Sequence, residues 1–328
     1  MIERTAGASN PRGTAAASPS AAFAGRKTIT RSRLGFSAKG YLFILPAVAL
    51  IAFIFVNPII RMFLFSLEGW SYLKPQGFND FRNYAVLLRD PHFYNTMLNN
   101  VIIILGVVPA VAVIALAFGQ AIFSRIPGYR LYTFLFFIPV VLPDVVVART
   151  LTEILNKVGP LNALFNAIGL DFLSQDWLGA PGLSLFSIIV SLVWKNIGFA
   201  LILFLARLTT IDIGIYEAAE IDGASSSQKY FSITLPLLSS TIKIYIVLQV
   251  IGLMAFLFNY IHVMTAGGPG YSSTVLEYFI YLNTFRLQEI GRGSAAGVIL
   301  IVLTTFFIYY YVFRASGAER RATRRANG

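Results

Sequence analysis

Six long apolar stretches constrain the fold of this chain more than any other feature. A hydrocarbon core about 30 Å thick requires about 20 apolar residues from each helix that crosses it. None of the long runs shows the alternating pattern of a membrane β-barrel strand. We therefore expect an all-α, polytopic membrane protein with six transmembrane helices. The stretches lie approximately at 41–66, 98–123, 131–155, 183–206, 242–264 and 293–313.

The composition supports a membrane environment and excludes several kinds of site. Only 12% of the residues are charged, whereas soluble proteins carry roughly 25%. The absence of cysteine excludes disulfides, thiolate metal sites and cysteine nucleophiles. The two histidines, His92 and His262, are too few and too far apart for a zinc site. We expect no metal.

The distribution of Lys and Arg predicts the orientation. The N-terminal tail, the 124–130 and 207–243 loops and the C-terminal tail carry 17 of them, against 6 in the other loops. Since cytoplasmic loops are enriched in these residues, we expect both termini in the cytoplasm and the chain in the cytoplasmic (inner) membrane. The net charge of +11 is then a signal of topology. We expect no binding to nucleic acid, because the basic residues flank helices and have no interleaved aromatic residues.

Three regions follow from this pattern. Residues 1–38 are dominated by Ala, Ser, Gly, Thr and Arg and should form a disordered, basic cytoplasmic tail. Residues 39–315 should form the six-helix transmembrane domain, embedded in membrane lipid and carrying a cytoplasmic loop at 207–241. Residues 316–328 should form a second basic cytoplasmic tail.

The 207–241 loop carries the strongest local signals. Asp212 is a suitable N-cap for a helix that ends near Ile221, and Gly223 is suited to a left-handed turn. A second short helix can start at Ser225, and Pro236 should separate it from the next membrane span. We expect a helix–turn–helix on the membrane surface, small enough to dock into a groove of another protein. The alternative is an ordinary amphipathic loop helix.

This loop resembles the EAA motif of ABC importer permeases. That motif reads Glu-Ala-Ala, three residues, Gly, nine residues, Ile, one residue, Leu-Pro. All seven positions occur here at the same spacing, as Glu217-Ala218-Ala219, Gly223, Ile233 and Leu235-Pro236.

A second stretch narrows the resemblance. Thr265-Ala-Gly-Gly-Pro269 is similar to the Thr-x-Gly-Gly-Pro loop of carbohydrate-uptake permeases, in the group of the maltose, lactose and glycerol-phosphate "first" permeases. The resemblance covers about residues 40–315. It implies a permease subunit that imports a carbohydrate and is coupled to a separate ATPase through the loop.

The resemblance also implies partners and coupling residues. The partners would be a second permease subunit, an ATPase dimer and an extracytoplasmic sugar-binding protein. No Gly-x-x-x-x-Gly-Lys-Ser/Thr sequence occurs in the chain, so we expect no enzyme activity, no catalytic residue and no cofactor here, with ATP and Mg bound by the partner ATPase. The implied coupling residues are Glu217, Ala218, Ala219, Asp222, Gly223, Ile233, Leu235 and Pro236.

Polar residues inside the apolar stretches are candidates for the substrate pathway. We single out Asn259, Tyr260 and Asn196. The alternative for each is a hydrogen bond between helices. Lys195 should either pair with a carboxylate or extend towards a membrane surface.

A different class of function remains open on the residues alone. In an ion-coupled secondary transporter, Asp144, Arg149 and Lys195 would be coupling sites. Arg149 has two possible partners, Glu153 one helical turn later and Asp144 across a break at Pro143. This alternative, like that of a membrane scaffold without transport, leaves the 217–236 motif unexplained, and no inverted repeat supports it.

Overall fold

The computed structural model describes residues 38–71 and 74–326, with side chains for 41–71 and 74–311. The predicted tail 1–38 therefore lies, up to residue 37, outside the described residues. The chain divides into two compact units, with the boundary between Phe55 and Val56. The first unit contains α1 (Ala38–Ile51) and most of the π-helical turn η1 (Ala52–Val56).

The first predicted span is confirmed as a 27-residue apolar helix, Tyr41–Leu67. Its last part, α2 (Asn57–Leu67), begins with Pro58 in the first turn. Proline has no N–H for the i→i−4 pattern, and the single π-helical turn η1 lies directly before this interruption.

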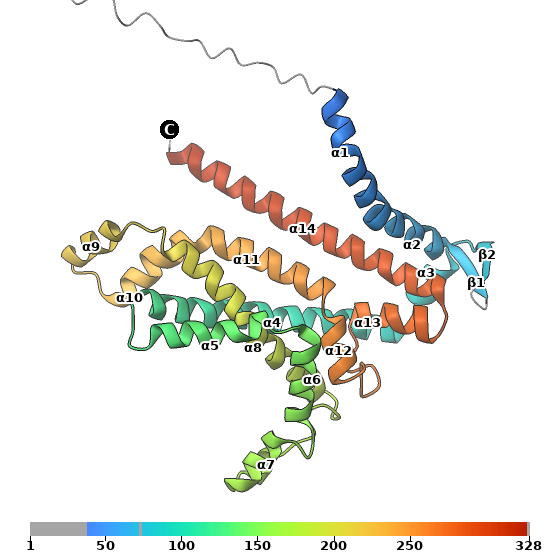
Figure 1. Ribbon diagram of the computed structural model, residues 1–328, viewed down its shortest axis with the longest axis horizontal. Helices are drawn as coiled ribbons and strands as arrows, with labels where there is room; N and C mark the ends of the chain where they lie inside the picture. The colour runs from blue at the N-terminus through green and yellow to red at the C-terminus, as the bar shows by residue number, and fades with distance from the viewer. Residues whose placement is uncertain (1–37, 72–73, 327–328) are drawn as a thin grey trace, which may run out of the picture. The chain divides into compact units, whose positions relative to one another are not determined.

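The second unit is built around long helices that pack along one another (Figure 1). They are α4 (Pro91–Phe123), α5 (Tyr129–Val141), α8 (Leu183–Leu208) and α11 (Leu235–Ala255). Their shared core is aliphatic and aromatic, and includes Ile103, Val111, Ile188, Phe204 and Tyr245. The close approach of α8 to α5 depends on a glycine. A Cβ on Gly198 of α8 would collide with the carbonyl oxygen of Phe136 in α5.

The predicted third span is broken, which corrects the expectation of one helix over 131–155. α5 ends at Val141, and α6 (Asp144–Leu155) starts after Pro143. The two parts of the span, 129–141 and 144–167, differ in direction by 104°. The second part includes α7 (Pro160–Ala167), and the short η2 (Asp171–Leu173) follows it. Pro143 causes the break because it cannot donate to the carbonyl of Pro139.

The predicted fifth span also needs correction. The helix runs from Ser226 to Ala255, and residues 258–264 form a separate short helix, α12 (Phe258–Met264). Pro236 does not separate the loop from this span as expected. It lies in the first turn of α11, after a π-helical turn, η3 (Tyr230–Thr234), so the chain stays helical through it. Within the described residues, five helices are long and apolar enough to cross a membrane, or six if the bent pair counts as one span.

One end of the second unit carries elements that an all-α prediction did not include. Strands β1 (Glu68–Ser71) and β2 (Lys74–Phe78) form an antiparallel hairpin in which Trp70 pairs with Pro75. It is followed by α3 (Arg82–Leu87). Beside them lie α13 (Leu276–Tyr281), η4 (Leu282–Arg286) and the start of α14 (Ile290–Ala326).

The last helix packs against α2, α3 and α13. Its Gly297 approaches Met62 of α2 so closely that a Cβ there would lie 2.6 Å from the sulfur. The backbone of α14 stays helical to Ala326 and so includes most of the predicted basic tail 316–328.

Candidate functional site

The 207–241 loop contains one separate short helix, α9 (Ile213–Ile221), as predicted, but the predicted second short helix is the first turn of the continuous helix Ser226–Ala255. The Asp212 side chain accepts a hydrogen bond from the N–H of Gly214 at 3.0 Å and caps α9. Gly223 has a φ of 77°, a conformation that favours glycine. The predicted N-cap and the predicted left-handed turn are both confirmed.

That first turn is held firmly to α9. Ser225 and Gln228 form a reciprocal capping box at the start of α10 (Ser226–Lys229). The ammonium of Lys229 then lies 2.5 Å from a carboxylate oxygen of Glu220 in α9. The turn at Gly223 is therefore stabilised by the capping box that follows it and by the ion pair between α9 and α10.

One face of α9 contacts the rest of the protein, and the other is exposed. The hydroxyl of Tyr216 is 2.9 Å from that of Thr234, and its ring lies 6.1 Å from that of Phe123 at the end of α4. Ile213 is 64% exposed and Ile221 is 87% exposed. The exposed apolar side chains and the inward tyrosine together make α9 a surface element with a fixed orientation.

The motif residues are distributed over this loop and the helix that follows. Glu217 and Ala218 lie exposed on α9, with Ala219 half-buried beside them. Asp222 is the C-cap of α9. Among the described side chains, Glu217 has no ion-pair partner. The other three motif residues come after α10: Ile233 lies in η3, and Leu235 and Pro236 lie in the first turn of α11.

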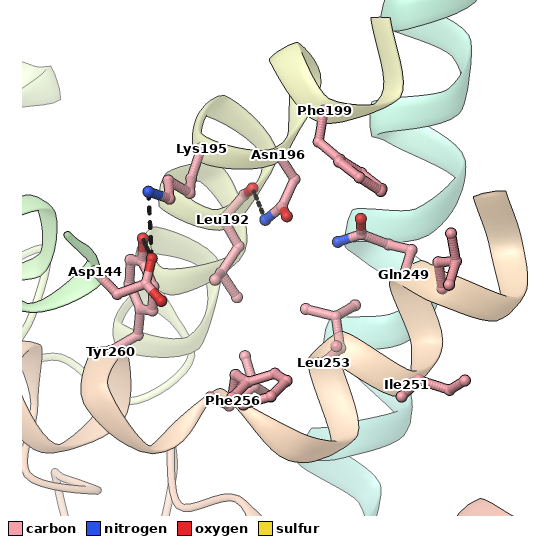
Figure 2. A pocket seen from close by; sticks show the side chains of 13 residues that line it. Asp144, Leu192, Lys195, Asn196, Phe199, Gln249, Ile251, Leu253, Phe256 and Tyr260 are labelled. Atoms are coloured by element: carbon pink, nitrogen blue, oxygen red, sulfur yellow. Dashed lines mark hydrogen bonds and ion pairs between the residues drawn. The ribbon is translucent and has the colours of Figure 1, made fainter. Parts of the chain in front are cut away.

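A cavity of about 450 Å³ lies where α8, α11 and α12 meet the start of α6 (Figure 2). Polar and apolar groups face it together. Leu192, Phe199, Leu253 and Phe256 provide apolar wall. The polar side chains are Asp144, Lys195, Asn196, Gln249 and Tyr260.

Lys195, halfway along α8, closes the break between α5 and α6. Its ammonium donates to the carbonyl oxygens of Pro139 at 2.7 Å and of Leu142 at 2.5 Å, and lies 3.3 Å from the Asp144 carboxylate. The Pro139 carbonyl is the one that Pro143 leaves without a helical donor. A cation at the end of a helix also complements its dipole. Of the two expectations for Lys195, pairing with a carboxylate is confirmed.

The structure brings together two of the three predicted pathway residues. Tyr260 is almost fully buried, and its hydroxyl donates to Asp144 at 3.4 Å. Asn196 lines the cavity and donates to the Leu192 carbonyl at 2.8 Å. Asn259, by contrast, does not line the cavity. It is half-buried on α12.

Gln249 is the cavity residue that sequence reasoning missed. It is 5% exposed and lies within an otherwise apolar run of α11. An amide in such a run is itself a signal, because burying it requires a hydrogen-bond partner. Amide, phenol, ammonium and carboxylate groups beside apolar walls can bind a small hydroxylated molecule.

Two asparagine side chains of α4 form hydrogen bonds with the loop that follows α12. Asn99 donates to the carbonyl of Thr274 at 2.8 Å, and Asn100 accepts from the N–H of Leu276 at 2.8 Å. Inside the loop, the Thr274 hydroxyl donates to the Gly267 carbonyl at 2.9 Å. Gly267 has a φ of 78°. These contacts hold the end of the helix that carries Tyr260.

Comparison with known proteins identifies relatives over most of the chain. Residues 85–320 match the family described as "Binding-protein-dependent transport system inner membrane component". The probable ABC transporter permease protein YurN of Bacillus subtilis is 32% identical, covering 79% of this chain and 90% of that protein. The sulfoquinovosyl glycerol transport system permease protein SmoG of Agrobacterium fabrum is 32% identical, covering 81% and 87%. The trehalose/maltose transport system permease protein MalF of Thermococcus litoralis is 30% identical, covering 79% and 88%.

Solved structures agree on the fold. A bacterial ABC transporter involved in the import of the acidic polysaccharide alginate superposes with a TM-score of 0.73 at 22% identity, over 84% of this chain and 94% of that one. The family match covers more than half of the chain, and it agrees with the resemblance carried by the 217–236 motif. The chain therefore belongs to the binding-protein-dependent transport system inner membrane components, the permeases of ABC transporters.

Proposed function

We propose that this chain is the permease subunit of an ABC importer that carries a carbohydrate across the cytoplasmic membrane. Family membership supports the transporter class, and relatives named for trehalose/maltose, lactose and sulfoquinovosyl glycerol support the substrate class. The cavity of about 450 Å³, with amide and phenol groups beside apolar side chains, has a suitable size and chemistry.

The α9–α10 loop faces the cytoplasm in this proposal, and so do both termini. The excess of Lys and Arg on that side supports this orientation. The long helix α4 starts beside α3 and ends at Phe123 beside α9 (Figure 1). Because α9 is on the cytoplasmic side in this proposal, the β1–β2 hairpin and α3, at the opposite end of α4, lie on the outer side.

The exposed face of α9 is the observation that carries the proposal. A separate ATPase, which binds ATP and Mg, docks on this face through Ile213, Ile221 and Glu217. Apolar side chains in the centre of a docking surface contribute most of the binding energy. A carboxylate without an ion-pair partner among the described side chains is suited to a basic residue of the ATPase. Closure of an ATPase dimer then moves α9 as a rigid body.

Two further partners complete the transporter. A second permease subunit pairs with this chain, and an extracytoplasmic binding protein delivers the sugar. The family description supports the binding protein. Tyr260, Asn196 and Gln249 line the path of the sugar, and the ATPase provides the energy.

The ion-coupled alternative is not favoured by the family. Its proposed coupling sites also have structural roles in this chain. Arg149 pairs with Glu153 at 2.6 Å as an exposed pair one helical turn apart, and Lys195 holds the break between α5 and α6.

The coupling role is tested by ATP-driven sugar uptake in vesicles that contain the complete transporter. Glu217→Lys should abolish uptake while the chain still inserts and assembles with the second permease. Asp171→Lys, which reverses an exposed carboxylate in η2, is the control for the change of charge and should retain uptake. Normal uptake by Glu217→Lys would refute the docking role of α9.

Gly223 offers a test of the turn itself. Proline cannot adopt a φ of 77°, so Gly223→Pro should lose coupled transport. Asparagine tolerates this conformation, and a Cβ at this position meets nothing within 4 Å. Gly223→Asn should therefore retain most activity. Equal loss in both variants would show that the turn geometry is not what matters.

The substrate path is tested by comparing two amides. Gln249→Leu removes an amide from the cavity, and Asn259→Ala removes one from α12 outside its lining. We expect the first to change the rate or selectivity of uptake more than the second. The opposite order would place the path on the other face of α12.

A further inference from the structure

The cavity between α6, α8, α11 and α12 contains one acidic and one basic side chain, which differ in how far a ligand can reach them. Asp144 and Lys195 lie 3.3 Å apart at one side of the cavity (Figure 2). The Asp144 side chain is 37% exposed, whereas that of Lys195 is 11% exposed. A molecule in the cavity therefore meets the carboxylate more readily than the ammonium.

The Lys195 ammonium has no N–H left for a ligand. An ammonium has three N–H donors, and this one contacts three acceptors. They are the carbonyl oxygens of Pro139 and Leu142 and Oδ1 of Asp144. An acidic ligand would have to displace one of them, and the two carbonyl bonds hold the break between α5 and α6. Lys195 is therefore a structural cation and not a binding site for an anion.

The Asp144 carboxylate, by contrast, retains a free acceptor. Its Oδ1 accepts from the Tyr260 hydroxyl at 3.4 Å and faces Lys195. Its Oδ2 has no donor among the residues that the structure describes. Asp144 is also the first residue of α6, where a carboxylate complements the helix dipole. The helix end that would otherwise attract an anionic ligand is thus already occupied by a negative charge of the protein.

The other side of the cavity carries uncharged polar groups that a ligand can reach. Gln249 extends into it from α11 (Figure 2), and its amide forms no hydrogen bond within the described part of the chain. The residue is 5% exposed, yet its amide atoms do not belong to the unpaired polar atoms that the protein shields from solvent. Asn196 donates to the Leu192 carbonyl and keeps its own oxygen as an acceptor. Since a buried amide requires hydrogen-bond partners, Gln249 indicates an occupant of the cavity.

These groups together select a ligand that donates hydrogen bonds and carries no negative charge. Oδ2 of Asp144 and Oδ1 of Asn196 need donors, and the Gln249 amide can take either role. A hydroxyl group meets both needs, because it donates one hydrogen bond and accepts others. An ionised carboxylate only accepts, and here it would face the like charge of Asp144. Like charges brought together in this way strongly disfavour binding.

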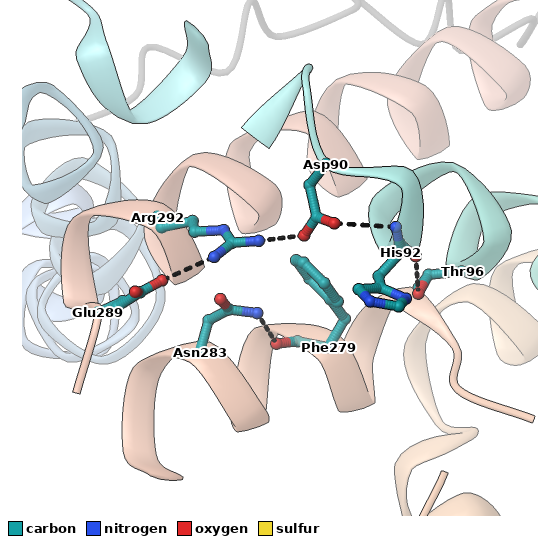
Figure 3. Close-up of polar contacts among 7 residues, drawn as sticks. All are labelled: Asp90, His92, Thr96, Phe279, Asn283, Glu289 and Arg292. Atoms are coloured by element: carbon teal, nitrogen blue, oxygen red, sulfur yellow. Dashed lines mark hydrogen bonds and ion pairs between the residues drawn. The ribbon is translucent and has the colours of Figure 1, made fainter. Parts of the chain in front are cut away.

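A second partly buried cation, at the hairpin end of the chain, is neutralised in a similar way. Arg292 pairs with Asp90 and donates to Glu289 at 2.9 Å (Figure 3). Two carboxylates therefore surround one guanidinium, and its Nε–H is shielded from solvent. Neither Lys195 nor Arg292 is available to attract an acidic ligand.

We propose that Asp144 makes the cavity selective for neutral carbohydrates and against acidic ones such as uronates. The proposal rests on the proposed function for the carbohydrate class. Asp144 is then a specificity-determining residue, because its free oxygen accepts from a sugar hydroxyl and its charge repels a carboxylate. Lys195 holds Asp144 in place and does not attract the ligand.

The test compares each neutral sugar with the uronate that carries a carboxylate in place of its CH₂OH group. Saturation-transfer NMR titrations give the Kd of glucose, galactose and mannose and of the three corresponding uronates, at neutral pH, where the uronates are ionised. The protein is the assembled transporter in lipid nanodiscs, without ATP and without the binding protein, which would impose its own selectivity. The measured quantity is the ratio of the Kd of a uronate to the Kd of its parent sugar.

In the wild type we expect saturable binding of at least one parent sugar, with its uronate bound at least about 10-fold more weakly, because two carboxylates repel strongly at a partly buried site. Asp144→Asn keeps the shape of the side chain and removes its charge, so the ratio should fall about 10-fold or more. Asp144→Glu keeps the charge and should keep a high ratio. Asp171→Asn makes the acid-to-amide change at an exposed carboxylate outside the lining and should leave the ratio unchanged.

A further variant tests whether the sugar occupies this cavity. Gln249→Leu removes the free amide and should raise the Kd of the parent sugar about 3- to 10-fold, the effect of one hydrogen bond. Continued binding of the parent sugar by Asp144→Asn, with a melting temperature close to that of the wild type, would show that this variant folds.

Several results would overturn the proposal. Uronates that bind the wild type as tightly as their parent sugars would show that Asp144 does not exclude them. An unchanged ratio in Asp144→Asn would assign the selectivity to another group, and binding that is insensitive to Gln249→Leu would place the sugar elsewhere. No saturable binding of any of the six compounds would mean that water alone occupies the cavity. Failure of the proposed function is distinct from these outcomes, because it would appear as absent ATP-driven uptake of any sugar by the complete transporter, whatever the ratio of the Kd values.

Discussion

Lys195 provides the sharpest test of how the broken span is held. Its ammonium makes two hydrogen bonds to carbonyl oxygens and one longer ion pair, to Asp144 at 3.3 Å. We predict that the carbonyl bonds, and not the ion pair, stabilise the 104° bend between α5 and α6. Two variants separate these contributions.

Lys195→Met removes both carbonyl bonds and leaves the oxygen atoms of Pro139 and Leu142 without a donor. Hydrogen bonds that involve a charged group contribute about 1.5–3 kcal/mol each, so the loss should be about 3 kcal/mol or more. Asp144→Asn removes only the ion pair. Because the Asp144 side chain is 37% exposed, solvent screening limits this loss to about 0–1 kcal/mol.

Thermal unfolding of the purified transporter in nanodiscs distinguishes the two. At about 2–4 °C per kcal/mol, Lys195→Met should lower the melting temperature by about 6 °C or more, and Asp144→Asn by less than about 4 °C. Lys157→Met, at an exposed lysine after α6, should have no effect. Equal destabilisation by Lys195→Met and Asp144→Asn would refute the reasoning and assign the bend to the ion pair.

Three further predictions concern other contacts. Burial raises the pKa of Glu277, which lies outside the membrane-spanning helices, to about 8, above the unfolded value of 4.5. The stability that the protonated Glu277 contributes is therefore complete below about pH 4.5 and is lost as the pH rises through about 8. Glu277→Gln should reduce the fall in melting temperature between about pH 6 and 9. An unchanged dependence of the melting temperature on pH would contradict this. Gly198→Ala should push α8 away from Phe136 at a cost of about 1–3 kcal/mol, measured by thermal unfolding, and a neutral effect would show that the two helices separate easily. Asn99→Leu should cost about 2 kcal/mol, because it leaves the Thr274 carbonyl without its donor, whereas Asn259→Leu should cost less in the same assay.

Hydropathy and local rules predicted most of the helices, and in the 207–241 loop they predicted α9 and the turn that follows it. A span is a property of one segment, and a cap or a left-handed turn is a property of a few neighbouring residues. Asp212 and Gly223 could therefore be assigned before any tertiary contact was known. The same rules failed for Pro236, because a π-helical turn let the helix continue through a residue that usually ends one.

The cavities could not be predicted in the same way. Gln249 faces Asn196 and Tyr260 only because α11, α8 and α12 pack together. Asn259 differs from Tyr260 by one position, and this step of about 100° around a helix decides which of them lines the cavity. Another cavity, between the β1–β2 hairpin and the start of α14, joins Trp70 to Arg292 across more than 200 residues of sequence, a distance at which no sequence motif operates.

The unbroken helix from Ser226 to Ala255 has a mechanical consequence. Thirty residues make a rod about 45 Å long. One end is joined to α9 by the ion pair between Lys229 and Glu220, and the part near the other end carries Gln249 into the lining of the cavity shared with α8 and α12. A tilt of about 10° around the midpoint of such a rod displaces its two ends by about 4 Å in opposite directions. Movement of the α9 end in one direction and of the cavity wall in the other is then a single movement that requires no hinge.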